Sequence, residues 1–559
     1  MVLSGANIII ETLIGQGCDT VFGYPGGQVI DLFEALYQNS SRIRCILTAH
    51  EQGAAHAADG YARATGKTGV VLATSGPGAT NLITGIAAAY LDSVPVVAIT
   101  GNVPCSQIGR DSFQEVDIVG VSMPVTKHNF IVKDIRELAE TLREAFRIAC
   151  SGRPGPVLVD IPKDVQTALC EYTPPEAPAE PEPLRRASDR RLLRAAAMIA
   201  ESERPYIYFG GGVISSGAAE NLAALAEKLD AAMGCSLMGL SAIPSDHPRF
   251  LGMQGMHGHF AASAAEDEAD LVLALGVRFS DRATGAEERF SQNFRIIHID
   301  IDGAELNKNI RAQLTIRGDL NDALSRLNQL LPAQHHPMWQ NRIRALRQEE
   351  AERTARAHDK LRSNLLRHDQ IIDAVSAAAP ADAVIATDVG QHQMWAAQRY
   401  PLKAPRTFLS SGGLGAMGFG LGAAIGAYLA TGKQIVLFTG DGSFGMNLNE
   451  LATAVSQQAK ITVVIMNNGV LGMVRQLQTF FYAQHYSGTT LNRRTDFVRL
   501  AEAFGAKGAR AENPEQLRCA LEAAMAENGP FVIDCPMDCD EPVLPMLPPG
   551  GSIDDIITE

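Results

Sequence analysis

Short apolar runs that end in glycine or polar residues recur along the chain, and alanine-rich segments separate them. In the first part, residues 42–50, 70–74 and 94–100 are predicted strands, and residues 51–66 and 79–91 are predicted helices. Strands that alternate with helices in this way are typical of a parallel sheet with crossover helices. The pattern therefore predicts an α/β fold of doubly wound, mostly parallel sheets.

The same alternation returns twice further along the chain. The predicted strands of the second run are residues 206–212, 271–277 and 295–302, and those of the third are residues 382–390, 434–442 and 461–468. The first and third runs share a faint echo, SGPGATNLITGIAAAY against SGGLGAMGFGLGAAIGAY, which hints at a duplication. We expect three domains of the same class.

Two stretches of different composition separate the runs. Residues 171–184 are dense in proline and acid, which predicts an exposed linker, and the charged residues 339–367 predict a solvated helix between domains. The predicted division is a first domain at 1–170, a central domain at 186–335, a third domain at 366–540 and a tail at 541–559. The prolines and glycines of the tail suit a lid over the site.

Composition narrows the function classes. The chain has 559 residues, 46% of them hydrophobic, and no uninterrupted apolar run long enough to span a bilayer. Its net charge of −14 disfavours nucleic acid and anionic membranes as partners. Nine cysteines without a CxxC pair argue against a disulfide framework and a zinc site. Because the first apolar stretch contains Glu11 and lacks a basic start, we expect no signal peptide and a cytoplasmic protein.

The strongest chemical signal lies at the ends of two predicted strands. Gly440-Asp441-Gly442 ends one apolar run and Asn467-Asn468 ends the next, with a predicted helix between them. Mg²⁺ prefers oxygen ligands and keeps substrate phosphate, so Asp441, Asn468 and the carbonyl of Val470 suit a magnesium diphosphate site. Either half alone is as readily a turn or a polar strand end. Together they resemble the motif of the thiamine-diphosphate-dependent enzymes.

That resemblance implies a glutamate that protonates the cofactor's aminopyrimidine, and Glu51 occupies its position. Glu51 follows a strand and opens a helix, where a carboxyl in a partly apolar site can hold a raised pKa; it also suits the helix dipole, which is the plainer interpretation. Met417 matches the apolar wedge that bends the cofactor, although methionine commonly only fills gaps. The other expected contacts with thiamine diphosphate are Gly23, Tyr24, Pro25, Gly26, Gln391, His392, Gly415, Gly442 and Ser443.

A denser resemblance covers almost the whole chain. The segments HEQGAAHAADGYARATGK, TSGPGATNLITG, FQEVDIVG, LGMQGMHG, GVRFSDRATG and GMVRQ resemble those of acetolactate synthase large subunits. The resemblance implies decarboxylation of pyruvate and ligation of the remaining two-carbon unit to a second 2-ketoacid, pyruvate or 2-ketobutyrate. It also implies a homodimer or homotetramer whose sites are shared between the first domain of one subunit and the third of its neighbour. A regulatory small subunit is a further possible partner.

The resemblance implies FAD in the central domain. Glycines after a strand are by themselves a weak nucleotide signal. The matching flavin contacts are Arg153, Gly210, Gly211, Gly212, Met256, His257, Gly276, Arg278, Asp281, Arg282, Asp300 and Asp319. FAD in this family takes no net redox part, so a largely structural role is expected.

Substrate handling is also inferred from the resemblance. The expected catalytic residues beside Glu51 are Phe113, Gln114 and Lys163, and the expected substrate pocket is Met473, Val474, Leu477 and Arg282. The chain departs from the family pattern at Asn102, Ser280 and Leu477. Leu477 stands where a tryptophan is common, which predicts a looser pocket, a weaker preference for 2-ketobutyrate and poor sulfonylurea binding.

Rival interpretations remain open. A pyruvate oxidase or a 2-ketoacid decarboxylase would use the same Asp441, Asn468 and Glu51, and the segments FQEVD, DIPKD and GMHG count against both. A flavin-free acetolactate synthase is disfavoured by the central-domain matches. A catalytically silent protein of the same fold would be expected to have lost Glu51 or Asp441.

Overall fold

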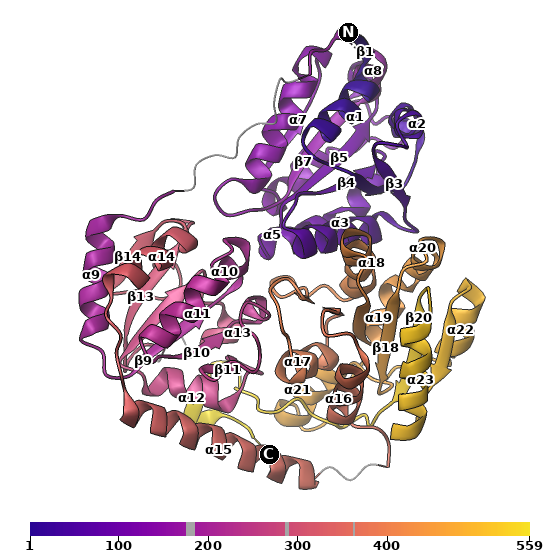
Figure 1. The fold of residues 1–559 in the computed structure, drawn as a ribbon. Helices are drawn as coiled ribbons and strands as arrows, with labels where there is room; N and C mark the ends of the chain where they lie inside the picture. Colours follow the sequence, from indigo (N-terminus) through magenta and orange to yellow (C-terminus); the bar gives the residue numbers. More distant parts are fainter. Residues whose placement is uncertain (175–184, 286–289, 361–363, 559) are drawn as a thin grey trace.

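The computed structural model describes residues 1–174, 185–285, 290–360 and 364–558. Within them the chain forms three lobes, each built on a six-stranded sheet in which every neighbouring pair of strands is parallel (Figure 1). The predicted α/β class of parallel, doubly wound sheets is confirmed. Most of the predicted linker, residues 175–184, lies outside the described residues.

The first lobe has the strand order β3-β2-β4-β5-β7-β6. Its strands are β2 (Thr20–Gly23), β3 (Arg44–Leu47), β4 (Gly69–Ala73), β5 (Val96–Asn102), β6 (His128–Ile131) and β7 (Val157–Pro162), and β1 (Val2–Ser4) pairs antiparallel with β8 (Leu169–Glu171). Its helices are α1 (Gly5–Gly15), α2 (Ile30–Gln38), α3 (Glu51–Thr65), α4 (Pro77–Asn81), α5 (Ile83–Leu91), α6 (Ile118–Ser122), α7 (Ile135–Cys150) and α8 (Lys163–Thr167). Every residue of β5 is buried, as expected for a strand covered on both faces.

The central lobe has the strand order β11-β10-β9-β12-β13-β14. Its strands are β9 (Pro205–Phe209), β10 (Ala232–Cys235), β11 (Phe250–Met253), β12 (Leu271–Leu275), β13 (Arg295–Asp300) and β14 (Leu314–Arg317). Its helices are α9 (Asp189–Ala200), α10 (Gly211–Ser215), α11 (Ala219–Lys228), α12 (Phe260–Glu268), α13 (Asp281–Thr284), α14 (Leu320–Leu330) and α15 (Pro337–Lys360).

The third lobe has the strand order β16-β15-β17-β18-β20-β19. Its strands are β15 (Val384–Thr387), β16 (Phe408–Leu409), β17 (Ile435–Gly440), β18 (Ile461–Asn467), β19 (Lys507–Arg510) and β20 (Phe531–Pro536). Its helices are α16 (His368–Ala378), α17 (Gln391–Arg399), α18 (Phe419–Thr431), α19 (Asp441–Asn447), α20 (Leu451–Ser456), α21 (Gly472–Phe481), α22 (Phe497–Phe504) and α23 (Pro514–Ala526).

The first and third lobes have the same topology, and equivalent helices pack against each other. In both six-stranded sheets the second strand along the chain, β3 or β16, lies at an edge, and the helix that follows it is α3 in one lobe and α18 in the other. These helices lie side by side (Figure 1). A Cβ at Gly426 would lie 1.9 Å from the carbonyl oxygen of Ala57, so only glycine permits this approach. The two segments of the sequence echo do not occupy equivalent positions in the two lobes. The first segment follows β4, whereas the second follows β16, which is the counterpart of β3.

The charged segment after the central lobe differs from its prediction. It forms α15, but Trp339, Ile343 and Leu346 are buried in the apolar core between this helix and the central sheet. The helix is therefore attached to the central lobe on one face and is not solvated all round. No helix in the described part of the chain is long and apolar enough to cross a membrane.

The tail after β20 is ordered through Thr558 and runs across two lobes (Figure 1). Gln476 exchanges two hydrogen bonds with the backbone of Val543, and the N–H of Leu547 donates to the carbonyl of Met256 over 2.7 Å. Beyond that point Ile553 and Ile556 pack on the central core. The tail thus ties the third lobe to the central lobe.

Candidate active site

Glu51 stands at the carboxyl edge of the first sheet, as the first residue of α3 after β3. Its side chain is buried and accepts a hydrogen bond from the Asn81 amide over 3.0 Å. A Cβ at Gly78 would lie 3.3 Å from a Glu51 carboxylate oxygen, so a glycine keeps space open beside the carboxyl. The carboxyl is therefore held by an amide donor within a turn that leaves room for a ligand.

The glycine turn after β2 lies at the same edge. A Cβ at Gly26 would approach the Thr74 side chain to 2.5 Å, which explains why the turn passes so close to the strand beside it. Gly23 ends β2, and the Tyr24 side chain next to it is 42% exposed. Tyr24, Pro25 and Gly26 thus present an open turn at the edge that also carries Glu51.

The three other expected catalytic residues of the first lobe gather at this edge. A Cβ at Gly76 would lie 2.9 Å from the Cα of Gln114, so the loop that carries Phe113 and Gln114 lies on the turn after β4. Lys163 begins α8, donates to the carbonyl of Gly27 over 3.1 Å and pairs with Asp31 at 2.5 Å. The Phe113 ring is 85% exposed. The expected residues of this lobe therefore share one edge, and part of it faces outward.

The predicted magnesium ligands meet at the carboxyl edge of the third sheet. Gly440 of β17 is paired with Met466 of β18, so Asp441 and the two asparagines follow neighbouring strand ends. Burial raises the pKa of Asp441 to about 6. The Asn468 carbonyl accepts from the N–H of Val470 over 3.3 Å, while Asn467 is turned away and donates to Asp534 over 2.9 Å. Asp441, Asn468 and the Val470 carbonyl form an oxygen-rich set that fits Mg²⁺.

Polar groups suited to a diphosphate lie beside these ligands. The His392 ring lies against Gly440, where a Cβ would be 3.0 Å from its Nδ1. Burial lowers the pKa of His392 to about 3, and its Nε2 is buried without a hydrogen-bond partner among the described residues. Gln391 begins α17 and accepts from Asn468, and Ser443 donates to the carbonyl of Val389. In the neutral tautomer that carries its proton on Nε2, this unpartnered nitrogen can donate to a diphosphate oxygen.

A cavity of about 690 Å³ lies where the three lobes meet. Thirteen of the site residues expected from the sequence line this cavity: Arg153, Gly211, Gly212, Met256, His257, Gly276, Arg278, Arg282, Asp300, Asp319, Gly415, Met473 and Leu477. This volume is within the range of cofactor pockets. The expected flavin and substrate residues are therefore brought together, while Gly210, Asp281, Met417, Gly442 and Val474 are not in the lining.

The five residues outside the lining have defined surroundings. Gly210 lies directly before Gly211, and a Cβ on it would meet the carbonyl of Gly276 at 2.5 Å. Asp281 lines an adjoining cavity of about 610 Å³ and lies 3.8 Å from the Arg282 guanidinium. The Met417 methyl would lie 3.8 Å from a Cβ at Gly442. Val474 is on α21 and is 47% exposed.

The central part of the cavity fits a dinucleotide. A Cβ at Gly212 would lie 2.7 Å from the Cα of Gly276, so the glycines of two neighbouring strand ends leave bare backbone. Asp300 ends β13, and burial raises its pKa to about 6. Ligands of open α/β sheets bind at these carboxyl ends. The second carboxylate oxygen of Glu305 is buried without a partner in the described part of the chain and can accept from a ligand hydroxyl.

Comparison with known proteins agrees with this arrangement. Residues 3–121 match the N-terminal TPP binding domain of thiamine pyrophosphate enzymes, residues 192–327 their central domain and residues 388–535 their C-terminal TPP binding domain. The chain is 46% identical to the acetolactate synthase isozyme 2 large subunit of Escherichia coli over 558 residues, covering 98% of each chain. It is 45% identical to the probable acetolactate synthase large subunit of Methanocaldococcus jannaschii over 566 residues, covering 99% of this chain and 95% of the relative.

The chain belongs to the acetolactate synthase large-subunit family. Membership confirms the resemblance inferred from its motifs. It is shown by identity over nearly the whole length and by the three matched domains.

The three departures from the acetolactate synthase pattern have defined surroundings. Asn102 is buried and donates to Asp160 over 2.6 Å, which anchors the end of β5 beside β7. Ser280 is the N-cap of α13 and accepts from the N–H of Arg282 over 3.3 Å. Leu477 lines the large cavity, where its side chain is smaller than a tryptophan.

Sequence reasoning missed two buried acids near the candidate acetolactate synthase site. Asp388 is fully buried, has its pKa raised to about 6 by burial, and accepts from the N–H groups of Gly418 and Gly420. Its only sequence signal is an acid at the end of the predicted strand 382–390. Glu305 had none, because nothing in its local pattern marks a cavity.

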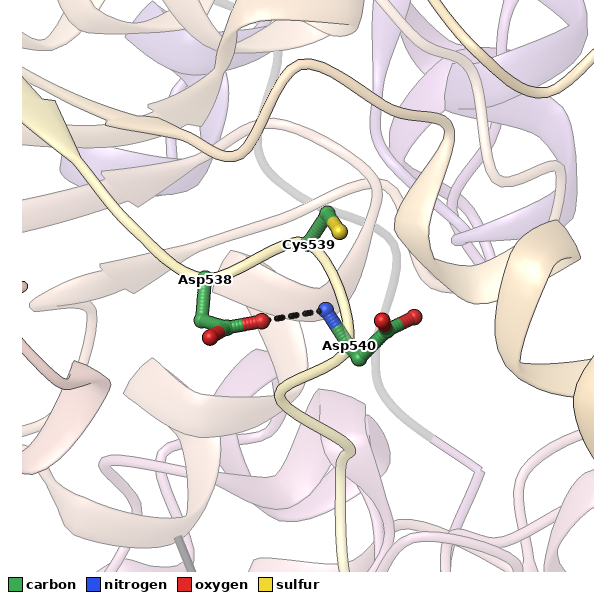
Figure 2. Close-up of side chains that lie close together, drawn as sticks. All are labelled: Asp538, Cys539 and Asp540. Carbon is green, nitrogen blue, oxygen red and sulfur yellow. Dashed lines mark hydrogen bonds between the residues drawn. The ribbon is translucent and has the colours of Figure 1, made fainter. Parts of the chain in front are cut away.

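A second group of possible metal ligands lies after β20. Figure 2 shows that Asp538, Cys539 and Asp540 gather at one turn, with the Asp538 carboxylate accepting from the Asp540 N–H over 2.9 Å. The Asp540 carboxylate is bound by Arg475 at 2.8 Å and is 61% exposed. An exposed carboxylate that already has a cationic partner is explained as part of a turn, and we assign no metal to it.

Proposed function

We propose that the chain catalyses acetolactate synthesis with thiamine diphosphate, Mg²⁺ and FAD, in branched-chain amino acid biosynthesis in the cytoplasm. It would decarboxylate pyruvate and join the two-carbon unit to a second pyruvate or to 2-ketobutyrate. The observation that carries the proposal is the pair of half-sites at equivalent sheet edges, Glu51 in one lobe and Asp441 with Asn468 in the other. Thiamine diphosphate, when bound, supplies a nucleophilic carbon and accepts the electron pair released with CO₂.

Each half-site has a separate task. Glu51, oriented by Asn81, holds a proton for the aminopyrimidine ring of the cofactor. Asp441, Asn468 and the Val470 carbonyl hold Mg²⁺, and Gln391, His392 and Ser443 hold the diphosphate. Met417 would supply the apolar wedge that bends the bound cofactor, and Gly415 and Gly442 would complete its contacts.

The remaining expected residues handle the substrates. Arg282 supplies positive charge for a 2-ketoacid carboxylate, and Met473, Val474 and Leu477 provide the apolar wall. Phe113, Gln114 and Lys163 complete the pocket from the first lobe. Exclusion of water and positioning of the second ketoacid favour ligation over simple decarboxylation.

We also propose that two chains complete each site. Glu51, Phe113, Gln114 and Lys163 do not line the large cavity of their own chain in its described part. An exposed Phe113 side chain at the sheet edge that carries Glu51 is the kind of surface that a second subunit covers. In this arrangement Glu51 acts on the cofactor bound by the neighbouring subunit. The relatives are named large subunits, and we propose a regulatory small subunit as a further partner.

The function is tested with purified protein, pyruvate, thiamine diphosphate, Mg²⁺ and FAD, following acetolactate, acetaldehyde and peroxide together. Acetolactate as the main product, lost in Glu51→Gln, supports the proposal. The control is Glu137→Gln, another glutamate in the first turn of a helix, which is expected to keep activity. Acetaldehyde or peroxide as the main product would instead assign a decarboxylase or an oxidase.

A further inference from the structure

A buried ionic cluster connects the first lobe to the loop that forms one wall of the cavity. Arg63, in the last turn of α3, pairs with Asp59 on the same helix and with Asp92 at 2.9 Å. Its guanidinium also donates to the carbonyl of Ser410 over 3.0 Å. The side chains of Asp59 and Asp92 are fully buried and that of Arg63 is 9% exposed. Such a cluster holds its geometry because breaking one pair leaves a buried charge.

Asp92 also accepts hydrogen bonds from the backbone of the third lobe. Its two carboxylate oxygens accept from the N–H of Gly412 over 3.0 Å and from the N–H of Gly413 over 2.7 Å. Hydrogen bonds from a backbone N–H to a carboxylate are among the stronger and more directional ones. The carboxylate therefore fixes both the position and the orientation of two consecutive peptide groups.

The three lobes meet at Gly413. A Cβ on this residue would lie 2.8 Å from the Cβ of Leu91, 2.9 Å from an Asp92 oxygen and 2.9 Å from an Arg278 guanidinium nitrogen. Asp92, Gly412 and Arg278 all line the large cavity. The position of this loop is therefore coupled to groups from all three lobes.

The same loop leads into the proposed cofactor contacts. Ser411 accepts from the N–H of Ala416, and Asp388 accepts from the N–H of Gly418, so the far end of the loop is anchored within its own lobe. Between these anchors lie Gly415 and Met417. The loop is thus held at one end by the third lobe and at the other by Asp92 of the first.

We propose that Asp92, oriented by Arg63, is a positioning residue that holds residues 410–418 against the cofactors. This inference rests on the proposed cofactor site. Asp92 sets the distance between the flavin side of the cavity, at Arg278, and the side of the cavity at Gly415. Displacement by about 1 Å in such a site can cost on the order of a hundredfold in rate.

The test compares Asp92→Asn with Asp230→Asn in the full-length protein. Asp230 is a matched control in the central lobe, because it also pairs with an arginine, Arg249, and accepts from a backbone N–H, that of His336, but lines neither cavity. Three quantities are measured: the flavin dissociation constant and visible spectrum, kcat against KM for pyruvate, and amide hydrogen exchange of the peptide that contains Gly412 and Gly413.

We expect Asp92→Asn to speed exchange of that peptide, to weaken flavin binding about tenfold with a shifted spectrum, and to lower kcat about tenfold with KM within about twofold. Arg63→Lys, which keeps the charge but loses the planar fork, is expected to show the same pattern more weakly. Asp230→Asn is expected to lower only the melting temperature.

The inference is overturned if Asp92→Asn, like the control, lowers the melting temperature and leaves exchange, flavin spectrum and kcat unchanged. Strictly additive effects of Asp92→Asn and Arg63→Lys in the double variant would also contradict it, because residues acting as one unit are coupled. Failure of the wild-type protein to form acetolactate would contradict the proposed function instead, and the exchange measurement would still test the loop.

Discussion

The side-chain amide of Asn468 donates to the side-chain carbonyl of Gln391 over 3.0 Å. This contact leaves the carbonyl oxygen of Asn468 directed to the N–H of Val470, within the proposed magnesium site. The Gln391 amide in turn donates to the carbonyl of Glu541 at the start of the tail, over 2.9 Å. The metal site, the diphosphate helix and the tail are therefore connected through one glutamine.

The two adjacent asparagines are expected to behave differently when removed. Asn468→Ala should raise the Mg²⁺ concentration needed for half-maximal activity by at least about tenfold, because a proposed ligand is lost. Asn467→Ala should leave that concentration unchanged and lower the melting temperature, since Asn467 binds Asp534 at the end of the neighbouring strand. Magnesium titrations and thermal unfolding of both variants check this, and equal magnesium affinities would contradict the assignment.

Gln391 is expected to act on the metal through Asn468. Gln391→Leu should weaken Mg²⁺ binding about tenfold, because the Asn468 side chain is then free to rotate. Gln393→Leu is a suitable control, since Gln393 is also buried on α17 but donates to Ser410. Calorimetric titration of Mg²⁺ in the presence of thiamine diphosphate measures both. If only Gln393→Leu bound Mg²⁺ more weakly, while Gln391→Leu kept the wild-type affinity, the proposed role of Gln391 would be wrong.

The size of residue 477 should set the choice of the second ketoacid. Leu477→Trp is expected to raise the ratio of 2-ketobutyrate to pyruvate incorporation about tenfold, because a large ring narrows the cavity wall that Leu477 forms. The wild-type protein should show a weak preference and poor sulfonylurea inhibition. Competition assays measure the ratio, with Leu193→Trp on the exposed face of α9 as the control. A strong wild-type preference for 2-ketobutyrate would refute the prediction.

Stability should depend on pH through Glu266 of α12. Burial raises the pKa of this carboxyl from 4.5 to about 8. The folded state therefore holds a proton that the unfolded chain releases, so the stability contributed by protonated Glu266 is complete below the unfolded pKa and is lost as pH rises to about 8.

Glu266→Gln removes this titration. Relative to the variant, the wild-type protein should lose at least about 1.4 kcal/mol of unfolding free energy between pH 5 and pH 8, the equivalent of one pKa unit. Denaturant unfolding at both pH values measures the difference. The exposed Glu220→Gln should unfold with the same pH dependence as the wild type. Parallel curves for the wild type and Glu266→Gln would disprove the assignment.

Much of the fold follows from local pattern. The apolar runs that end at Gly440 and Asn467 were predicted as neighbouring strands and form β17 and β18 with those ends. A buried strand needs a continuous apolar segment on both faces, and its polar end is forced to the sheet edge, so both features are written in consecutive residues. The same reasoning placed Glu51 at the start of α3.

The domain limits and site residues followed less directly. The three sheets lie within the proposed ranges 1–170, 186–335 and 366–540, and these boundaries stay a proposal, as do the roles of the site residues. Family resemblance supplied the flavin residues, because their glycines and acids carry only weak local signals. The structure gathers most of them at one cavity, which supports the assignment.

The sequence by itself determined the α/β class, the strand ends that carry Asp441 and Asn468, and the family. Tertiary structure alone decided that Asn468 binds Gln391 while Asn467 binds Asp534, that α15 packs on the central lobe, and that Asp92 binds Gly412 and Gly413. The physical reason is the separation in sequence between the residues that make each contact. Periodicity and strand termini depend on neighbours in the chain, whereas these contacts join residues far apart in sequence, and their geometry exists only once three separately folded sheets have packed together.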